Sequence, residues 1–473
     1  METNVVQKKR GFKVPHVYVI IFVLIVLVAI GTYFIPAGTY ERYIEPETGR
    51  TLVDPDSFRY VESSPVSLFG VFRAIPLGME KAAPIVFFIL IVGGAFQMIQ
   101  NTGVLDAVLP LVVASLKGKE KLLVPVTLII FSITGFCFGL AEETIVFIPI
   151  GIALARALNY DALVGMSIIY TGAATGFIGG MLNLFTVGIA QSIAELPLFS
   201  GLGFRFIAYA FFLLSAVWWC MRYASRVQAD LANSYVRELE LEQKDQRITI
   251  DADQLPPVSG RHKAVLLVIL LGFAYMIYGV FELEFYIVEL TTAFLMMGVA
   301  AGLAGGFSPS ELADSFVEGA KTIIFGSLVV GFARAILVVM EQAQIIDTVV
   351  AYLASVVGTF PGIFAALGMY VVQCIINLFI ISGPGQAQTS MPIMVPLADL
   401  IGVTRQTAVL AFQYGDALTN SILPTAGGLM GALAIGKIPY EKWFKFMAPL
   451  TVIWFIIGAV FIVISVLVGL GPF

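Results

Sequence analysis

Long apolar runs separated by short charged blocks are the feature that most constrains this chain. The first run covers residues 17–35 and follows a basic segment that contains Lys8, Lys9, Arg10 and Lys13. A helix of about 20 apolar residues crosses the hydrocarbon core of a bilayer, and backbone in hydrocarbon must satisfy its own hydrogen bonds. We therefore predict an all-α polytopic membrane protein.

Composition excludes several other classes of protein. Hydrophobic residues make up 59% of the 473 residues and charged residues only 12%, whereas a soluble domain carries about 25% charge. A soluble enzyme, a nucleic-acid binder and a disordered chain are thereby excluded. Cys137, Cys220 and Cys374 lie far apart in apolar segments without metal-ligand spacing, so we expect no transition metal and no cofactor.

Basic residues predict the orientation of the chain. Positive charge before the first run places the amino terminus in the cytoplasm, and this run is too long for the apolar core of a cleavable signal peptide. Residues 1–64 are thus expected to hold one span and an acidic outer loop. A second span, Ala82 to Ile99, returns the chain to a cytoplasmic segment with Lys117, Lys119 and Lys121.

A re-entrant hairpin is expected at about 122–157, inside a first repeat that covers residues 65–222. Its second apolar leg ends at Ala155 and is only about a dozen residues long, too short for a crossing. The two legs flank the polar tip Glu142-Glu143-Thr144, which a membrane tolerates only where protein or a watery cavity covers it.

The next apolar segment, about 162–190, is predicted to be two half-helices joined by unwound backbone. Glycine is costly inside a helix, and this segment is interrupted by Gly172, Gly176, Gly179, Gly180 and Asn183. A span from Phe204 to Met221 follows. Residues 223–263 are interpreted as a cytoplasmic linker with a solvated charged face, a regulatory or partner role being the alternative.

The second half contains the same kinds of element. Residues 264–306 are predicted to form two connecting spans, and Ser308-Pro309-Ser310-Glu311 is typical of the start of a short amphipathic helix. The second repeat, 307–473, is expected to hold a span at 323–340, a hairpin at about 362–401, a broken helix at about 406–436 and a last span at 446–468.

Sequence matches in order support an internal repeat. At an offset of 241 residues, Gly78 recurs as Gly319 and Val104-Leu105-Asp106 recurs as Ile345-Ile346-Asp347. At an offset of 244 residues, the segment 170–175 recurs as 414–419, and Pro149 recurs near Pro392. Counting from a cytoplasmic start gives nine crossings and two hairpins that enter from opposite sides. Inverted repeats with discontinuous helices are typical of secondary transporters.

Polar residues at the predicted tips and breaks form the candidate site. An acid in hydrocarbon normally faces a cavity and carries function, and broken helices offer free N–H and carbonyl groups. The predicted substrate-binding residues are Glu142, Glu143, Thr144, Asn183, Gln386, Gln388, Thr389, Asn420 and Thr425. The predicted ion-coupling residues, for Na⁺ or H⁺, are Asp416, Thr175, Thr419 and Ser421.

Structural interpretations stay open beside the functional ones. Glu142 could cap a half-helix, Asp416 could cap the helix end at its break, and residues 382–390 could be only a tight polar turn. Arg334 lies deep enough to be a counter-charge or a substrate clamp, or is a packed or snorkelling arginine. Glu341 is expected to be solvated near a membrane end. No Walker motif occurs, so ATP-driven transport is disfavoured.

Three segments carry a family resemblance. The chain resembles the YfcC family of carriers at three places: the end of the first span at Phe34–Gly38, the tip Gly139–Thr144 and the stretch from Ile422 to Ile438. That family is related to the anaerobic C4-dicarboxylate carriers and to certain arginine/ornithine exchangers. The wider group is similar to the ion-transporter superfamily. That resemblance implies a scaffold, hairpin-bearing transport regions, an elevator-like motion, a homodimer and a multi-pass protein of the bacterial cytoplasmic (inner) membrane.

The charges of the candidate site favour some classes of substrate over others. The candidate site carries up to three acids and no certain base, which favours a small amine-bearing molecule, such as an amino acid of arginine or ornithine type, moved by exchange or by ion coupling. The alternative is a C4-dicarboxylate or other short carboxylate carried with Na⁺ or H⁺. A channel or a membrane receptor is less consistent with two hairpins and two broken helices. An enzyme is disfavoured because no nucleophile and base stand at workable spacing.

Overall fold

The computed structural model describes residues 17–44, 51–105, 107–108, 111, 119–139, 142–242, 258–283, 285 and 287–471. Within these ranges the chain is almost entirely helical, apart from two small antiparallel sheets that pair β1 (Gly38–Thr39) with β4 (Arg59–Tyr60) and β2 (Arg42–Ile44) with β3 (Thr51–Val53). Five helices of the described part are long and apolar enough to cross a membrane, or six if one bent helix pair counts as a span. The all-α polytopic class is confirmed.

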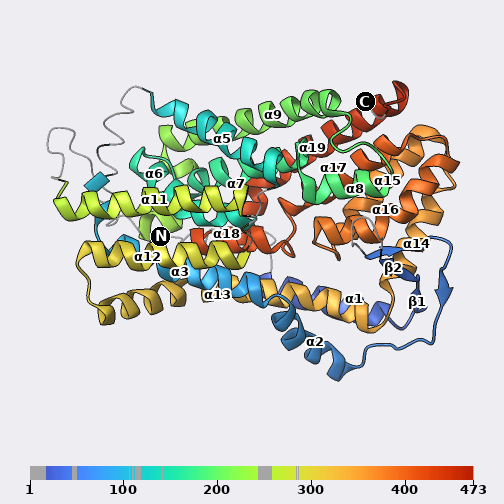
Figure 1. The fold of residues 1–473 in the computed structure, drawn as a ribbon, viewed down its shortest axis with the longest axis horizontal. Coiled ribbons are helices and arrows are strands. Elements are labelled where there is room, and N and C mark those ends of the chain that lie inside the picture. The colour runs from blue at the N-terminus through green and yellow to red at the C-terminus, as the bar shows by residue number, and fades with distance from the viewer. Residues whose placement is uncertain are drawn as a thin grey trace, which may run out of the picture.

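Two layers of helices make up the molecule (Figure 1). The first, which we call the α13 layer, runs along the bottom of Figure 1. It consists of α1 (Val17–Gly31), α2 (Leu68–Lys81), α3 (Ala83–Asn101), α11 (Gly260–Glu282), α12 (Ile287–Gly305) and α13 (Pro309–Gln342). Helix α13 packs against α1, α2 and α3, and α12 packs between α3 and α11.

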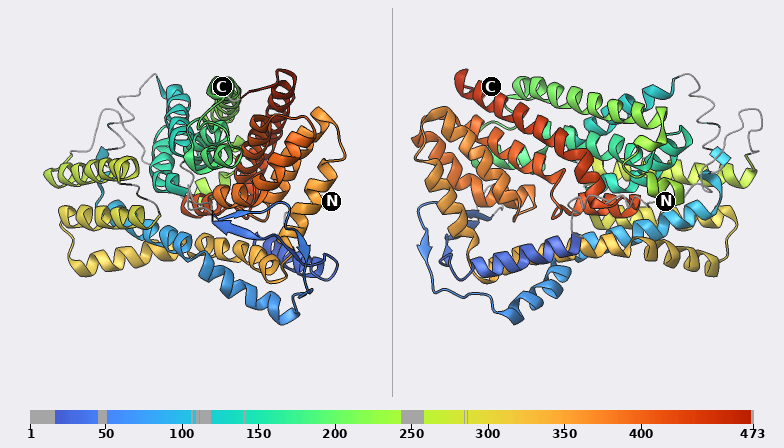
Figure 2. Two further views of the ribbon diagram at one scale, coloured as in Figure 1. Left: turned by 45° about the vertical axis from the view of Figure 1, so that its right-hand side comes forward. Right: turned by 180° about the vertical axis from the view of Figure 1, so that it is seen from behind.

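The second, which we call the hairpin layer, lies above it and holds both candidate hairpins. Figure 2 shows the same two layers in an oblique view and from behind. Its first half comprises η1 (Glu120–Leu122), α5 (Leu123–Phe138), η2 (Glu142–Phe147), α6 (Ile148–Ala157), α7 (Ala162–Gly179), the π-helical η3 (Leu184–Gly188), α8 (Ile189–Ile193) and α9 (Leu202–Ala229). Its second half comprises α14 (Ile346–Val357), α15 (Gly362–Asn377), α16 (Gly383–Leu400), α17 (Arg405–Asn420), α18 (Gly427–Gly436) and α19 (Tyr440–Leu467).

Helices α5 and α6 form a hairpin beside α7. Gly172 of α7 lies against Leu128 of α5 and Gly176 lies against Ser132, so α5 and α7 run in the same direction. Helix α6 runs the opposite way, because its end at Ala157 leads by a short turn into the start of α7. The chain therefore reverses after Gly139. That the turn lies inside the bilayer stays a prediction.

The second half repeats this geometry around α17. Gly415 of α17 lies against Gln373 of α15, and Asn377, one turn further along α15, bonds to Thr419. Helices α15 and α17 are thus parallel. Helix α16 returns alongside α15, with Gln386 bonded to Gln373. Each half therefore contains a broken helix that begins with α7 or α17, a parallel helix beside it (α5 or α15) and an antiparallel helix (α6 or α16).

The two broken helices cross each other in opposite directions. Gln413 of α17 donates a 2.5 Å hydrogen bond to the carbonyl of Phe177 in α7, and Tyr170 donates a 3.3 Å bond to the carbonyl of Asn420. Beyond the crossing, η3 and α8 pack on α16, while α18 packs on η2 and α6. The second part of each broken helix therefore contacts the hairpin of the other half.

Several predicted boundaries were wrong. Helix α1 ends at Gly31 and not at residue 35, because the Thr32 hydroxyl bonds to the carbonyl of Ala29 and accepts the N–H of Val66, turning the chain. The short helix expected at Ser308 is instead the start of the long α13, with the predicted capping box present and a 43° bend between Phe325 and Ser327. Helix α9 extends beyond the predicted span, to Ala229.

The glycine interpretation of the first broken helix was also partly wrong. Gly172 and Gly176 lie inside a continuous α7, and the break comes only at Gly180, which is left-handed at φ +52°. A Cβ at Gly176 would lie 1.9 Å from the carbonyl oxygen of Ser132. Glycine at this position is therefore required by the close approach of α5, and not by a break.

The charged linker is not a uniformly solvated face. Glu240 of α10 (Arg237–Glu242) is buried, forms a 3.1 Å ion pair with Arg156 and accepts the N–H of Ala162 at the start of α7. The neighbouring Asp161 caps α7 and bonds to Tyr223 and Ser234; burial raises the pKa of this carboxyl. The interpretation of the linker charges as solvated is wrong for Glu240.

We predict that Gly176→Ala destabilises the protein by about 1–3 kcal/mol, because the added methyl group forces α5 and α7 apart. Gly203→Ala is the matched control, since no atom lies within 4 Å of its Cβ position; it should be neutral or stabilising by up to about 1 kcal/mol. Thermal unfolding of the detergent-purified variants measures both changes. Equal melting temperatures for the two variants would contradict the packing argument.

We also predict that Glu240→Ala lowers the free energy of unfolding by about 3 kcal/mol, because it breaks a buried ion pair and removes a cap from α7. Glu238→Ala on the same helix replaces an exposed side chain and should change stability by no more than about 0.5 kcal/mol. Denaturation curves compare the two. A Glu240→Ala protein as stable as the control would show that α10 is not held by this pair.

Candidate functional site

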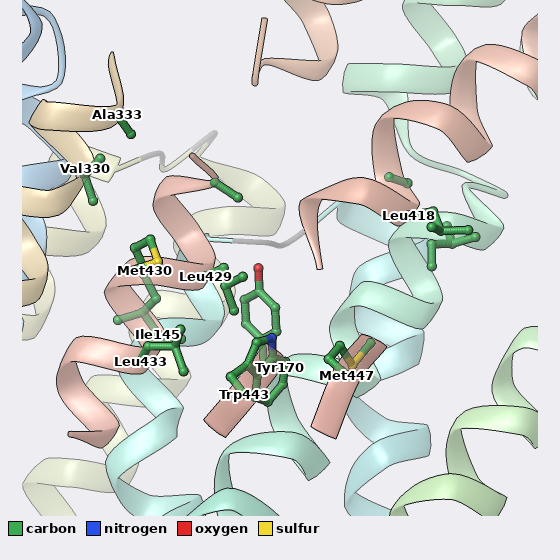
Figure 3. Packing of buried hydrophobic residues seen from close by; sticks show 14 of the residues in the cluster. Ile145, Tyr170, Val330, Ala333, Leu418, Leu429, Met430, Leu433, Trp443 and Met447 are labelled. Carbon is green, nitrogen blue, oxygen red and sulfur yellow. The ribbon is translucent and has the colours of Figure 1, made fainter. Parts of the chain in front are cut away.

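The candidate site lies where α7 and α17 cross and where both helices break. A cavity of about 30 Å³ sits at the crossing, and its walls include Tyr170, Phe177, Ala417, Asn420 and Ser421. Such a volume holds a water molecule or two. Figure 3 shows Tyr170 beside Trp443 of α19, whose ring centre is 5.7 Å away and whose Nε1 donates to the carbonyl of Ser421.

Asp416 lies one turn before the break of the second helix and is fully buried. The amino terminus of α16 approaches it closely, since a Cβ at Gly383 would lie 3.4 Å from Asp416 Oδ2 and 2.5 Å from Thr186 Cγ2. A side chain at this position would force the Thr186 methyl group to shift. Free N–H groups at a helix start favour negative charge, so α16, η3 and α17 together provide a place for a buried carboxylate.

Asn377, which the sequence analysis missed, holds the end of α17. Its Nδ2 donates to the carbonyl of Asp416 at 2.8 Å, to Thr419 Oγ1 at 2.7 Å and to Asn420 Oδ1 at 2.8 Å. Its Oδ1 is buried and has no hydrogen-bond partner among the described residues. The only signal in the sequence was an amide at the end of an apolar leg, next to the tip.

The predicted tip 382–390 is mostly helical. The turn covers only residues 378–382, because Ser382 caps α16 and Pro384 stands in its first turn. Gln386 is buried and bonds to Gln373 of α15, so its side chain connects the two helices of the hairpin. The Thr389 hydroxyl bonds to the carbonyl of Gly385 within α16. Gln388 is half-buried. The interpretation of this segment as one polar turn is wrong.

The first tip is described only in part. The backbone of Glu142 and Glu143 lies in η2, but their side chains fall outside the described residues. Thr144 is buried. Asn183 caps η3 through Oδ1, and its buried Nδ2, which has no partner in the described part of the chain, lies near Gly139. The start of η3 therefore faces the beginning of the first tip.

Of the remaining predicted residues, three lie near the second break and one lies inside a continuous helix. Thr419 and Ser421 lie at the end of α17, and Thr425 lies in the break with a buried hydroxyl that has no partner among the described residues. Thr175 does not lie at a break: it is inside α7 and bonds to the carbonyl of Thr171. A threonine in a helix commonly bonds back in this way, so an ion role for Thr175 lacks a geometric basis.

Two arginine side chains lie within the helices, one on α9 and one on α13. Arg205 of α9 is fully buried and bonds to Gln406 at 3.2 Å, which the sequence analysis missed. Arg334 of α13 has a buried Nε without a partner among the described residues. Glu341 is exposed, as predicted, and pairs with Lys81 of α2. Among the described residues no group of three or more His, Cys, Asp or Glu side chains could hold a metal ion.

Comparison with known proteins decides the family. A family model described as "DcuC: C4-dicarboxylate anaerobic carrier" matches residues 14–467. The chain belongs to the DcuC family. This DcuC-family chain is 31% identical to the "Putative basic amino acid antiporter YfcC" of Escherichia coli (strain K12), over 97% of this chain and 98% of that protein. The resemblance to the YfcC carriers is thereby confirmed.

Further relatives extend along the whole chain. An uncharacterized protein of Haemophilus influenzae is 28% identical over 97% of this chain and 98% of its own length. Among solved structures, the Neisseria gonorrhoeae MtrF efflux pump aligns over 98% of this chain and 97% of its own, with 17% identity and a TM-score of 0.41. The Alcanivorax borkumensis YdaH transporter aligns over 96% and 99%, with 14% identity and a TM-score of 0.40. This DcuC-family chain is a multi-pass membrane transporter.

Proposed function

We propose that this protein is a secondary transporter of a small amine-bearing metabolite, an amino acid of arginine or ornithine type, moved by exchange. The observation that carries this proposal is the buried carboxylate of Asp416 at the end of α17, next to the crossing of two broken helices. A carboxylate in such a place attracts a cationic group. The name of the 31% identical relative, a basic amino acid antiporter, supports the same substrate class.

The polar groups around Asp416 suit an ammonium group and a coupling cation. Carbonyl and amide oxygens stand next to it: Asn377 Oδ1 is buried without a partner among the described residues, and Asn420 Oδ1 faces Asn377. Oxygen atoms of this kind bind Na⁺ or an ammonium group. We include Asp416, Thr419 and Ser421 in the proposed ion path and Glu142, Glu143 and Asn183 in the substrate site.

Alternating access follows from the two layers. The hairpin layer meets the α13 layer mainly through α18, which packs on α13 and α3. We propose that the hairpin layer moves against the α13 layer in an elevator-like manner and exposes the site to one side at a time. We also propose a homodimer in the bacterial inner membrane with the amino terminus in the cytoplasm, where the basic amino-terminal segment belongs.

The second candidate function is the transport of a C4-dicarboxylate or another short carboxylate with Na⁺ or H⁺. The description of the family as C4-dicarboxylate anaerobic carriers favours it. A dianion would then enter a region that contains Asp416, and cotransported cations would have to offset that charge.

We predict counterflow of labelled arginine or ornithine in proteoliposomes that contain the purified protein. Glu142→Gln or Glu143→Gln should lower the rate at least about tenfold, because loss of one charged contact to a buried ammonium group costs roughly 1.5 kcal/mol or more. Glu238→Gln, on the exposed face of α10, is the control and should leave the rate unchanged. Counterflow of dicarboxylates alone would overturn the choice of substrate.

A separate prediction concerns Asp416. Replacing it with Asn removes the titratable and cation-binding group, so the dependence of uptake on pH or on Na⁺ should disappear while the protein still folds. Asp399→Asn is the matched control, since Asp399 is 45% exposed and lies at the end of α16. Uptake is measured over a range of pH and Na⁺ concentrations. If Asp416→Asn keeps the wild-type profile, Asp416 has no part in coupling.

A further inference from the structure

Arg334 is a charged side chain at membrane depth that the packing of the protein does not account for. It is half-buried, its Nε is fully buried, and it has neither a hydrogen bond nor an ion pair among the described residues. Arg156, which is also half-buried, pairs with Glu240, and the fully buried Arg205 bonds to Gln406. A buried donor without a partner destabilises a protein, so an arginine kept in this state points to a ligand.

The position of Arg334 places it beside the second helix break. Val330, one turn earlier on α13, lies against the first residue of α18, since a Cβ at Gly427 would be 3.1 Å from Val330 Cγ1. Figure 3 shows Val330 and Ala333 on the side of α13 that faces Met430 of α18. Thr425 lies in the break, two residues before Gly427, and its buried hydroxyl also has no partner among the described residues.

The depth of Arg334 is set by the length of α13. The helix ends at Gln342, and the carbonyl of Gln344 pairs with Gly38 at the base of the β1 strand. Eight residues of α-helix are about 12 Å long, and the hydrocarbon core is about 30 Å thick. With the membrane surface taken at the end of α13, where Lys81 and Glu341 pair, the guanidinium starts from a point inside the hydrocarbon core. Its buried Nε shows that the side chain is enclosed by protein at its base.

We propose that Arg334, with the hydroxyl of Thr425, binds the carboxylate group of the transported molecule. This inference rests on the proposed function and narrows it: the substrate is an α-amino acid and not a simple amine or a polyamine. The buried Asp416 of the hairpin layer takes the ammonium group, and the guanidinium of the α13 layer takes the carboxylate group. Arginine is suited to this role because its planar fork pairs with both carboxylate oxygens.

The proposed arrangement divides the substrate between the two layers. Asp416 belongs to the hairpin layer and Arg334 to the α13 layer, and α18 lies at the seam between them. A ligand that bonds to both layers favours the conformation in which they are apposed, because it can shift an equilibrium only by its differential affinity for the two states. An amine without a carboxylate lacks the contact to Arg334, so its binding should not stabilise the conformation in which the two layers are apposed.

Binding of matched ligands to the purified full-length protein tests the proposal. L-arginine, L-argininamide and agmatine share the guanidinium end, but only L-arginine carries a carboxylate. We expect the wild type to bind L-arginine at least about tenfold more tightly than the other two, and Arg334→Gln to weaken L-arginine binding by about 10- to 100-fold while leaving the argininamide affinity unchanged. Arg334→Lys, which keeps the charge, should recover part of the loss.

Lys321→Gln is the matched control, because it removes one positive charge from an exposed position on the same helix. It should leave all three affinities unchanged. An Arg334→Gln protein that loses affinity for L-arginine and argininamide equally, or for neither, overturns the role of Arg334 while the proposed function stands. A wild-type protein that binds neither amino acids nor their amides, but binds dicarboxylates, overturns the proposed function itself.

Discussion

Backbone groups that a helix break frees must find partners within the protein or in an enclosed cavity, and this constraint organises the centre of the molecule. The break after α17 is stabilised by Asn377, which bonds to the carbonyl of Asp416 and to the side chains of Thr419 and Asn420. The break after α7 is held by Gln413, which bonds to Phe177. Each broken helix thus receives hydrogen bonds from an amide of a neighbouring helix, α15 for α17 and α17 for α7.

The crossing also explains why the halves contact each other reciprocally. Because α7 and α17 are antiparallel, the second part of each lies against the hairpin of the other half: η3 and α8 on α16, and α18 on η2 and α6. Reciprocal contacts of this kind follow from an approximate two-fold relation. They bring polar groups from distant parts of the sequence to one place. Asp416, the start of α16 and the start of η3 meet there.

Buried and half-buried charges in this protein differ in whether their hydrogen bonds are satisfied. Glu240 and Arg156 pair at the base of α7, where the linker docks on the hairpin layer, and their contribution is structural. Arg334 has no such partner among the described residues. Burial alone therefore does not mark a functional charge: the satisfaction of its hydrogen bonds separates the two cases.

The sequence by itself determined the membrane class, the helix-rich fold, the repeated order of elements and the family, because hydrophobic runs and glycine or proline interruptions are local properties. It also placed Asp416 and Asn420 near a break. It could not show that Thr175 lies inside a helix, that Glu240 is buried, or that Asn377 holds the end of α17. Glu240 meets Ala162 across 78 residues of chain and Asn377 meets Thr419 across 42, and contacts between distant segments leave no local pattern.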